Sequence, residues 1–256
     1  RFAFKDAEEA YRKIEKGEDD FLGVTFLYDK LKEEKVKTVD LRTKPLEEAK
    51  VSIGIIGAGN FAKTMLLPFL KKEKEVVLDT VATATGISAK DTASKFDFRK
   101  ASTDYKQILE NKAVNTVMIL TRHSSHAVFV KESLNSGKNV YVEKPLCVDI
   151  ENLPELECAL TSSGRVLMVG YNRRFSPAII KLKELIDGLC VPFSIHYRVN
   201  AGFIPPDHWY QQPENGGRII GEGCHFVDTL QFLTGSHPVS VYATAVVSND
   251  KSMPDQ

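Results

Sequence analysis

A glycine-rich segment, Gly57-Ala58-Gly59-Asn60-Phe61-Ala62, carries the clearest chemical signal in the sequence. It fits the pattern G-x-G-x-x-G/A and lies between a predicted strand over 51–56 and a predicted helix that runs to residue 70. In that setting the first glycine permits a tight turn, the second lets the backbone approach a diphosphate, and Ala62 allows close helix packing. The free N–H groups at the start of the helix then face the phosphates. A tight turn without a ligand is the alternative. We expect a dinucleotide to bind at Gly57, Gly59, Asn60, Phe61 and Ala62.

The end of the next predicted strand, over 76–83, bears on which dinucleotide this would be. An Asp or Glu there would bind the adenosine ribose of NAD, but the sequence has Thr83 and Thr85. A threonine hydroxyl, such as that of Thr83, can bond the ribose without repelling the 2′-phosphate of NADP. No arginine stands beside these threonines to attract that phosphate. The cofactor is therefore NAD or NADP, and the lack of an arginine favours NAD.

Glu143 and Lys144 form a second candidate group, directly after a short predicted strand over 139–142. Ligands of open parallel sheets bind at the carboxyl ends of the strands, so both side chains would lie at the ligand-binding edge. Pro145 fixes the local backbone and biases Lys144 away from a helical conformation. A Lys-Pro pair in a surface loop is the alternative interpretation.

Strands and helices alternate along residues 51–170. Besides the elements named above, the pattern predicts helices at 91–96, 125–136 and 151–162 and strands at 114–120 and 165–170. Such alternation is typical of a parallel sheet covered by helices on both faces. We therefore predict an α/β chain that contains a Rossmann doubly wound parallel sheet.

A different pattern follows residue 175. Helices are predicted at 177–186 and 222–233, and strands at 192–200 and 239–246. This pattern indicates an α+β domain with an open mixed sheet. Because the sequence stops where more strands would follow, we expect an incomplete domain in a piece of a longer protein. The expected domains are 50–171 for dinucleotide binding and 172–256 for the start of a substrate and oligomerisation domain.

The first 49 residues differ from the rest of the chain. Asp6 and Gly17 are expected to begin and end a helix, and the apolar run 21–28 predicts a strand. One helix and one strand cannot bury a core alone, so residues 1–28 are expected to be the remnant of a preceding domain. The charged residues 29–49, which include Pro45, are expected to be a linker.

The composition excludes several classes of protein. Lys and Arg number 34, as do Asp and Glu, so no net charge attracts the chain to nucleic acid or to an anionic membrane. A hydrophobic content of 43% is enough for a folded core, and no apolar run approaches the ~20 residues of a membrane span. The four cysteines are scattered, which argues against a zinc site and for a reducing, cytoplasmic setting. We expect no metal, no nucleic acid and no membrane among its partners.

Four motifs in this order resemble the Gfo/Idh/MocA oxidoreductase family, the relatives of glucose–fructose oxidoreductase and inositol dehydrogenase. They are the glycine segment 57–62, the run Asn-Val-Tyr-Val-Glu-Lys-Pro-Leu at 139–146, the run Gly-Tyr-Asn-Arg-Arg-Phe-Ser-Pro at 170–177, and the segment 216–228. The resemblance covers residues 51–246. It implies a Rossmann domain, then an α/β domain whose open sheet often forms homo-oligomer contacts. It also implies nicotinamide-dependent oxidation or reduction of a sugar or polyol.

A narrower resemblance concerns residues 200–209 and 216–222. They are most similar to a subgroup that is fused behind a zinc-type alcohol dehydrogenase and is associated with surface polysaccharide synthesis. Residues 1–28 then look like the last helix and strand of such a dehydrogenase domain. This similarity implies a nucleotide-linked sugar as the substrate.

The family resemblance implies catalytic roles for Lys144 and His225. Lys144 would hydrogen-bond the reacting hydroxyl and stabilise the developing alkoxide, and His225 would take the hydroxyl proton as hydride leaves for the nicotinamide. Members similar to inositol dehydrogenase carry an aspartate four residues before this histidine, where this chain has Gly221. Glu222 is adjacent, but one residue along a helix turns a side chain by about 100°. Whether Glu222 replaces the aspartate is open.

Further residues are expected around these two. The family has a Thr-Pro-x-x-x-His type loop beside the nicotinamide, which Thr121 and His126 match with Arg122 in place of the proline. Asp228 lies three residues after His225 on the same helical face. Asn172 and Arg173 have an alternative role as a hydrogen-bonding anchor at the domain junction. Trp209 has an alternative role in packing its loop against the core. The expected substrate-binding residues are Asn172, Arg173, Trp209, Glu222 and Asp228.

Together these features predict an NAD(P)-dependent dehydrogenase or reductase that acts on the CH–OH group of a sugar. A non-catalytic or regulatory dinucleotide-binding module is the main alternative, and Gly221 is the observation that favours it. A third possibility keeps the cofactor but uses transient oxidation to carry out net hydrolysis or elimination.

Overall fold

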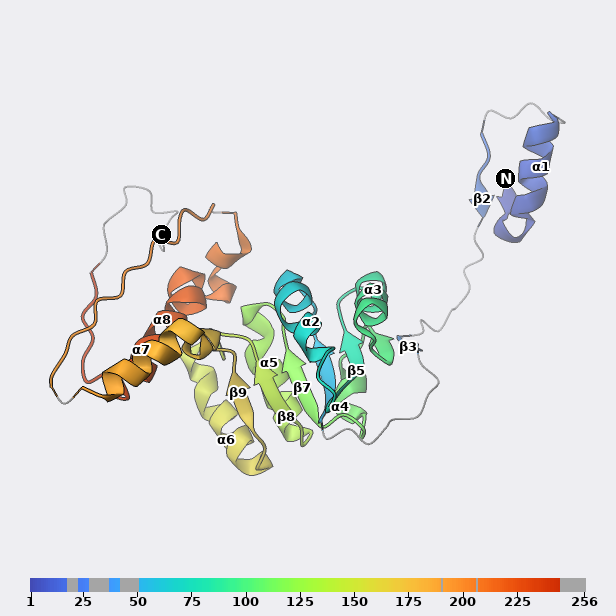
Figure 1. The fold of residues 1–256 in the computed structure, drawn as a ribbon. Coiled ribbons are helices and arrows are strands. Elements are labelled where there is room, and N and C mark those ends of the chain that lie inside the picture. The colour runs from blue at the N-terminus through green and yellow to red at the C-terminus, as the bar shows by residue number, and fades with distance from the viewer. Residues whose placement is uncertain (18–22, 28–36, 42–50, 190, 206, 245–256) are drawn as a thin grey trace. The chain divides into compact units, whose positions relative to one another are not determined.

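The computed structural model describes residues 1–17, 23–27, 37–41, 51–189, 191–205 and 207–244. The chain divides into two compact units, Arg1–Val36 and Lys37–Gln256. Figure 1 shows their helices and strands.

The N-terminal unit contains a helix and a small two-stranded sheet. Strand β1 (Phe2–Ala3) pairs in parallel with β2 (Phe26–Leu27), and helix α1 (Ala7–Lys16) lies between them in the sequence. The helix ends as predicted at Gly17, which has a left-handed φ of 62°, whereas Asp6 makes no side-chain capping hydrogen bond. Of the strand predicted at 21–28, only Phe26–Leu27 is a strand; residues 21, 22 and 28 lie outside the described residues.

The second unit is built on a parallel sheet. Seven strands of the described residues pair in the order β3-β6-β5-β4-β7-β8-β9, and every neighbouring pair is parallel except β3 with β6. This is the Rossmann doubly wound arrangement that the alternation of elements predicts, with an antiparallel strand added at one edge. The strands are β3 (Thr38–Asp40), β4 (Val51–Ile56), β5 (Val76–Ala82), β6 (Lys100–Ser102), β7 (Thr116–Ile119), β8 (Asn139–Val142) and β9 (Leu167–Val169).

Helices cover both faces of this sheet, and each face has its own apolar core. One core packs α3 and the segment that leads into α2 against β4 and β5, and the other packs α4, α5 and α6 against β7 and β8. Figure 1 shows these helices flanking the strands. The helices are α2 (Leu67–Leu70), preceded by a π-helical turn (Ala62–Leu66), α3 (Gly86–Phe96), α4 (Lys106–Glu110), α5 (His126–Asn135) and α6 (Leu153–Ser163).

The edge of the sheet corrects the prediction of a linker over 29–49. Within that range β3 is a strand, and Val39 pairs antiparallel with Ala101 of β6. Neither short strand was predicted, because three residues are too few for an alternating pattern to stand out. Residues 29–36 and 42–49 lie outside the described residues.

The segment after β9 contains helices α7 (Pro177–Asp187) and α8 (Cys224–Thr234) close to their predicted places. The strands predicted at 192–200 and 239–246 are not formed: residues 192–200 and 239–244 are irregular, and 245–246 lie outside the described residues. Val241 and Tyr242 are exposed. A strand needs a neighbour for its N–H and C=O groups, and none pairs with these segments in the described part of the chain.

Gly54 explains how closely α4 approaches the sheet. A Cβ at Gly54 would lie 2.2 Å from Cγ2 of Ile108, which is fully buried on α4. We expect Gly54→Ala to lower the free energy of unfolding by about 1–3 kcal/mol, because overpacking forces neighbouring groups apart. Chemical denaturation measures this loss.

The double variant Gly54→Ala/Ile108→Ala provides the control. Ile108→Ala is destabilising by itself, but it removes the methyl group that a Cβ at 54 would strike. The double variant should therefore lose less stability than the sum of the two single losses. Strict additivity would contradict this packing.

Candidate active site

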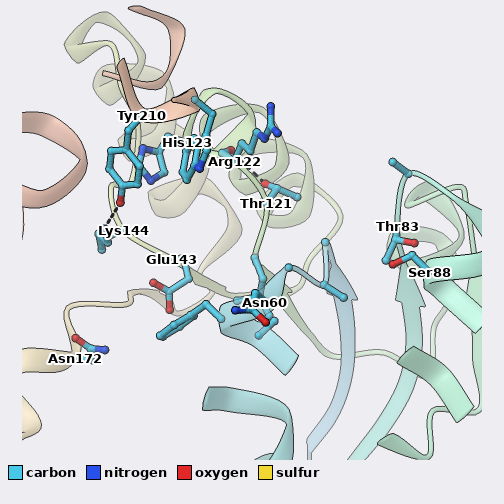
Figure 2. Close-up of a pocket in the computed structure, with 18 of the residues that line it drawn as sticks. Asn60, Thr83, Ser88, Thr121, Arg122, His123, Glu143, Lys144, Asn172 and Tyr210 are labelled. Carbon is cyan, nitrogen blue, oxygen red and sulfur yellow. Dashed lines mark hydrogen bonds between the residues drawn. The ribbon is translucent and has the colours of Figure 1, made fainter. Parts of the chain in front are cut away.

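A pocket of about 860 Å³ opens at the carboxyl ends of the parallel strands (Figure 2). The chain runs from β4 toward one edge of the sheet through β5 and β6, and toward the other through β7, β8 and β9. Ligands of open α/β sheets bind at such a switch of direction. The pocket is lined by residues 57–62, 83, 84, 88, 120–123, 143, 144, 172, 209, 210, 222 and 225.

The glycine turn forms the floor of one end of this pocket. Gly57 has a φ of 85°, and its N–H donates to the carbonyl of Ala82 at 2.8 Å. A Cβ on Gly57 would lie 2.7 Å from Cγ2 of Thr121, so only glycine fits. A Cβ on Gly59 would meet no atom within 4 Å. Gly57 is therefore closely packed by protein atoms, whereas Gly59 leaves open space for a ligand.

The residues that follow β5 lie where the adenosine ribose would bind. Thr83 lines the pocket, and its hydroxyl donates to the carbonyl of Thr85 at 2.8 Å. The Thr85 hydroxyl accepts the N–H of Ser88 and caps α3. Ser88 also lines the pocket, and the sequence analysis missed it because a serine at a helix start is usually a structural residue. This part of the wall is neutral, as the sequence indicated.

Lys144 lies in the middle of the pocket wall. Its ammonium donates to the carbonyl of Gly221 at 2.6 Å and to the hydroxyl of Tyr210 at 3.1 Å. Oε1 of Glu222 is 3.7 Å from the same nitrogen. Figure 2 shows the Tyr210 ring directed toward the lysine. The lysine side chain is only 12% exposed, so its charge is held between protein groups.

Glu143 precedes this lysine and also lines the pocket. One of its carboxylate oxygens accepts the hydroxyl of Tyr141 at 2.7 Å. Burial raises the pKa of the Glu143 carboxyl, although the Tyr141 hydroxyl and Lys144 oppose that rise. The tyrosine fixes the orientation of this carboxyl group at the pocket edge.

His225 reaches the pocket from the first turn of α8. It is 7% exposed, and its Nδ1 has no hydrogen-bond partner among the described residues. Burial, and then the charges of Lys144 and Arg173, lower the pKa of His225 to about 4. The imidazole is therefore neutral near pH 7, and a neutral imidazole has one ring nitrogen that can accept a proton.

His126, at the end of the loop after β7, does not have the place expected for it. His126 does not line the pocket; it is fully buried, with Nδ1 2.7 Å from the carbonyl of Pro145 and Nε2 3.2 Å from that of Thr121. It ties together the loops that follow β7 and β8. Thr121 does line the pocket, and its hydroxyl is 2.7 Å from that of Ser125.

His123, which the sequence analysis missed, lines the pocket in place of His126. Its Nδ1 is 2.9 Å from the carbonyl of Asn215, and its ring packs edge-on against Trp209 and Tyr210. Burial lowers the pKa of His123 to about 4. The sequence signal was present, since His123 is closer than His126 to the end of β7.

The five expected substrate-binding residues divide into two groups. Asn172, Trp209 and Glu222 line the pocket. Arg173 does not; its guanidinium lies 4.8 Å from the centre of the Phe226 ring. Asp228 does not line the pocket either; it is buried and pairs with Arg174, whose Nε donates to it at 3.0 Å.

Two family models match the chain. Residues 51–171 match "Oxidoreductase family, NAD-binding Rossmann fold", and residues 179–256 match the "GFO/IDH/MocA C-terminal domain". The chain belongs to the Gfo/Idh/MocA family. The residues around the glycine turn fit the cofactor of such a domain, because Gly59 leaves space for a diphosphate beside free backbone N–H groups. The cofactor of this Rossmann domain is NAD or NADP.

Individual members of the family show the range of its chemistry. A 1-carboxy-3-chloro-3,4-dihydroxycyclohexa-1,5-diene dehydrogenase of Comamonas testosteroni is 32% identical over 74% of this chain and 49% of its own length. An inositol 2-dehydrogenase of Rhizobium meliloti is 28% identical over 80% of this chain and 61% of its own. The chain thus spans about half to three-fifths of these curated relatives.

A solved structure gives a further comparison. A 3-ketoreductase from Actinomadura kijaniata, in complex with TDP-benzene and NADP, has a TM-score of 0.51 and is 25% identical. The match covers 54% of this chain and 43% of that chain. These comparisons show the family and the cofactor class.

Gly221 stands where the family resemblance implies an aspartate. A Cβ at this position would lie 2.6 Å from Cε1 of Tyr210 and 2.9 Å from Cε1 of His123. Two aromatic rings therefore occupy the space that an aspartate side chain would need. Glu222, the neighbouring acid, lines the pocket and accepts the hydroxyl of Tyr210 at 3.1 Å.

In the described residues, no group of three or more metal-binding side chains is placed to hold an ion. None of the helices in the described ranges is long and apolar enough to cross a bilayer.

His123 and His225, the two histidines that line the pocket, predict a loss of stability in acid. An unfolded histidine has a pKa of about 6.5, whereas those of His123 and His225 in the folded protein are about 4. Between these values only the unfolded chain takes up the protons. The free energy of unfolding should therefore decrease as the pH is lowered, by up to ~1.4 kcal/mol per pH unit for each histidine. Chemical denaturation at a series of pH values from about 7.5 to about 4 measures this slope, because that range roughly spans the unfolded and the folded pKa.

His123→Gln and His225→Gln should each flatten the slope. The matched control is His237→Gln, because His237 is exposed and lies outside the pocket. A slope that is the same in all three variants as in the wild type would contradict the assignment.

Proposed function

We propose that this chain is the oxidoreductase module of an enzyme that moves a hydride between the CH–OH carbon of a polyol or sugar and nicotinamide. One observation carries the proposal. The Lys144 ammonium and the neutral His225 imidazole line the same pocket as the open Gly59 turn. This pairing offers a hydrogen-bond donor for an alkoxide and an acceptor for a proton beside a dinucleotide site.

The residues divide the work as follows. Backbone N–H groups of the glycine turn hold the diphosphate, and the bound nicotinamide supplies the hydride acceptor. An ammonium has three N–H groups. Two of those on Lys144 are directed at Gly221 and Tyr210, which leaves one for the substrate oxygen. That hydrogen bond strengthens as negative charge develops on the oxygen, while His225 accepts the hydroxyl proton.

The substrate class is proposed from the pocket wall and the printed names of the relatives. Two of those names describe dehydrogenases that act on hydroxylated six-membered rings. Trp209 offers a flat face for a ring, and Asn172 offers an amide for hydroxyl groups. We propose NAD rather than NADP as the preferred cofactor, since the wall near Thr83 and Ser88 has no basic side chain among its lining residues.

A nucleotide-linked sugar, used in surface polysaccharide synthesis, is the narrower proposal. Arg122 supports it: the side chain is exposed at the pocket and lies 5.7 Å from the Trp209 ring centre, so its guanidinium is available for a phosphate. The 3-ketoreductase relative was crystallised with TDP-benzene, a nucleotide compound. In the same proposal, residues 1–28 derive from a zinc-type alcohol dehydrogenase.

A panel assay tests the function. The protein is mixed with NAD⁺ or NADP⁺ and with myo-inositol, free hexoses and nucleoside diphosphate hexoses, and formation of reduced nicotinamide is followed by absorbance. We expect turnover with at least one class, and turnover of the nucleotide-linked class alone would favour the narrower proposal.

A non-catalytic dinucleotide-binding module is the second candidate, favoured by the absence of a carboxylate at Gly221 and by the engagement of Lys144 with the Gly221 carbonyl. Bound cofactor that stays in one redox state across the whole panel would support this candidate and contradict the first.

A further inference from the structure

Tyr210 is a pocket residue that the sequence motifs do not single out. It comes from the short helical turn Trp209–Gln211, far from the sheet in sequence, and it lines the pocket. Its hydroxyl accepts a hydrogen bond from Lys144 at 3.1 Å and donates one to Oε1 of Glu222 at 3.1 Å. The phenol therefore connects the lysine ammonium to a carboxylate.

The directions of these hydrogen bonds are fixed by the groups themselves. An ammonium has no acceptor, so Lys144 must donate to the phenol oxygen. An ionised carboxylate has no donor, so the single phenol proton must be given to Glu222. The chain of bonds runs one way, from Lys144 through Tyr210 to Glu222, and it places negative charge behind the ammonium. Burial, and then the Glu222 charge, raise the pKa of Tyr210, which keeps the phenol protonated.

The surroundings of the ring hold this arrangement in place. The ring centre of Tyr210 lies 4.4 Å from that of Trp209 and 5.2 Å from that of His123. The Tyr210 ring also packs against Gly221, so closely that a Cβ at Gly221 would lie 2.6 Å from its Cε1. The Gly221 carbonyl meanwhile accepts a second N–H of Lys144 at 2.6 Å. The ring, the glycine and the lysine thus fix one another.

We propose that Tyr210 and Glu222 are positioning residues for Lys144, and that Glu222 supplies, across 3.7 Å and through the phenol, the counter-charge that a carboxylate at position 221 would supply. With two N–H groups held by Tyr210 and Gly221, the third is aimed at the substrate oxygen. Glycine at 221 is then required by the tyrosine, and the pair is one unit. This inference rests on the proposed function, so its test has one readout that needs no turnover.

The first readout is the kinetics of the wild type, Tyr210→Phe, Glu222→Gln and the double variant. Misplacing a catalytic group by a fraction of its contact distance lowers the rate of chemistry strongly, so each single variant should lose about 10- to 100-fold in kcat. The KM for the alcohol and the Kd for NADH should change by less than about threefold, because positioning acts on the transition state. The double variant should be no worse than the more damaged single variant, since both changes break one chain of bonds.

The second readout is the chemical reactivity of Lys144. The proteins are treated briefly with an amine-reactive ester, and labelling of each lysine is quantified by mass spectrometry. Release of the ammonium in Tyr210→Phe and Glu222→Gln should raise the labelling rate of Lys144 several-fold. Lys131, which pairs with Glu155 away from the pocket, is the internal reference.

Two further variants complete the design. Gly221→Ala should displace the Tyr210 ring and reproduce the loss of kcat with a folded protein. Tyr197→Phe makes the same chemical change at a ring that packs on Phe226 outside the pocket and should match the wild type in both readouts.

Unchanged kcat and unchanged Lys144 labelling in Tyr210→Phe would overturn the inference. If the wild type turns over no alcohol but Lys144 labelling still rises in the variants, the positioning is supported and the proposed function fails. Strictly additive losses in the double variant would contradict the single unit.

Discussion

Replacing Lys144 with alanine is expected to lower kcat by about two to three orders of magnitude and to leave the Kd for NADH within about threefold of the wild type. The reason is that the proposed chemistry uses this ammonium to stabilise the alkoxide, whereas the dinucleotide is held by the glycine turn. Steady-state kinetics on an alcohol that the wild type oxidises and fluorescence titration with NADH provide the two measurements.

Lys144→Arg is the matched control for this prediction. It keeps the charge, but a planar guanidinium cannot reproduce the contacts of 2.6 Å to the Gly221 carbonyl and 3.1 Å to Tyr210 together with a free N–H. We expect its kcat to lie between those of the wild type and the alanine variant. Turnover preserved in Lys144→Ala would remove this residue from the mechanism.

Gly59→Val is expected to weaken the binding of NADH by about 100-fold, which corresponds to ~2.7 kcal/mol. The space around Gly59 contains no atom within 4 Å of a Cβ, and its φ lies outside the left-handed range, so the folded chain can accept a side chain. The same space is where the diphosphate must approach the backbone. The valine should therefore exclude the cofactor without unfolding the protein. Isothermal titration calorimetry measures the affinity, and thermal denaturation confirms the fold.

Gly23→Val serves as the control for this substitution. Gly23 also has open space around its Cβ position and a φ outside the left-handed range, but it belongs to the N-terminal unit. It should bind NADH as the wild type does. An unchanged Kd in Gly59→Val would show that the diphosphate lies elsewhere.

The parts of the fold that could be predicted are those with a local cause. A buried apolar strand followed by a glycine turn at Gly57, which has a positive φ and no room for a Cβ, predicts one strand–turn–helix unit from a dozen residues. Lys144 was placed at the ligand-binding edge because a strand ends directly before it. The pattern does not predict the β3–β6 pairing, since both strands are three residues long and paired residues lie 60 to 64 positions apart.

The parts of the site that could not be predicted depend on packing between distant segments. Tyr210 lies in a loop without periodicity, and its contact with Lys144 spans 66 residues of sequence. The resemblance favoured His126, but the choice between it and His123 depends on how the loop after β7 enters α5. Asp228 shares a helix face with His225, as predicted, yet Arg174 from another element captures its carboxylate.

The predicted strands after α7 illustrate a different limit. A sequence of alternating apolar residues indicates that a segment can form a β-strand, but the strand forms only where a neighbouring strand is present to pair with it. Residues 192–200 and 239–244 have no pairing strand among the described residues and remain irregular. A strand prediction therefore depends on the partner strand as well as on the segment itself.

A crystal structure of the protein grown with NAD⁺ tests the central claim most directly. We expect a diphosphate against the backbone N–H groups of residues 57–62 and a nicotinamide ring beside the Lys144 ammonium. A dinucleotide bound elsewhere, or a glycine turn that stays empty at saturating NAD⁺ while Lys144 remains far from any ligand, would contradict it.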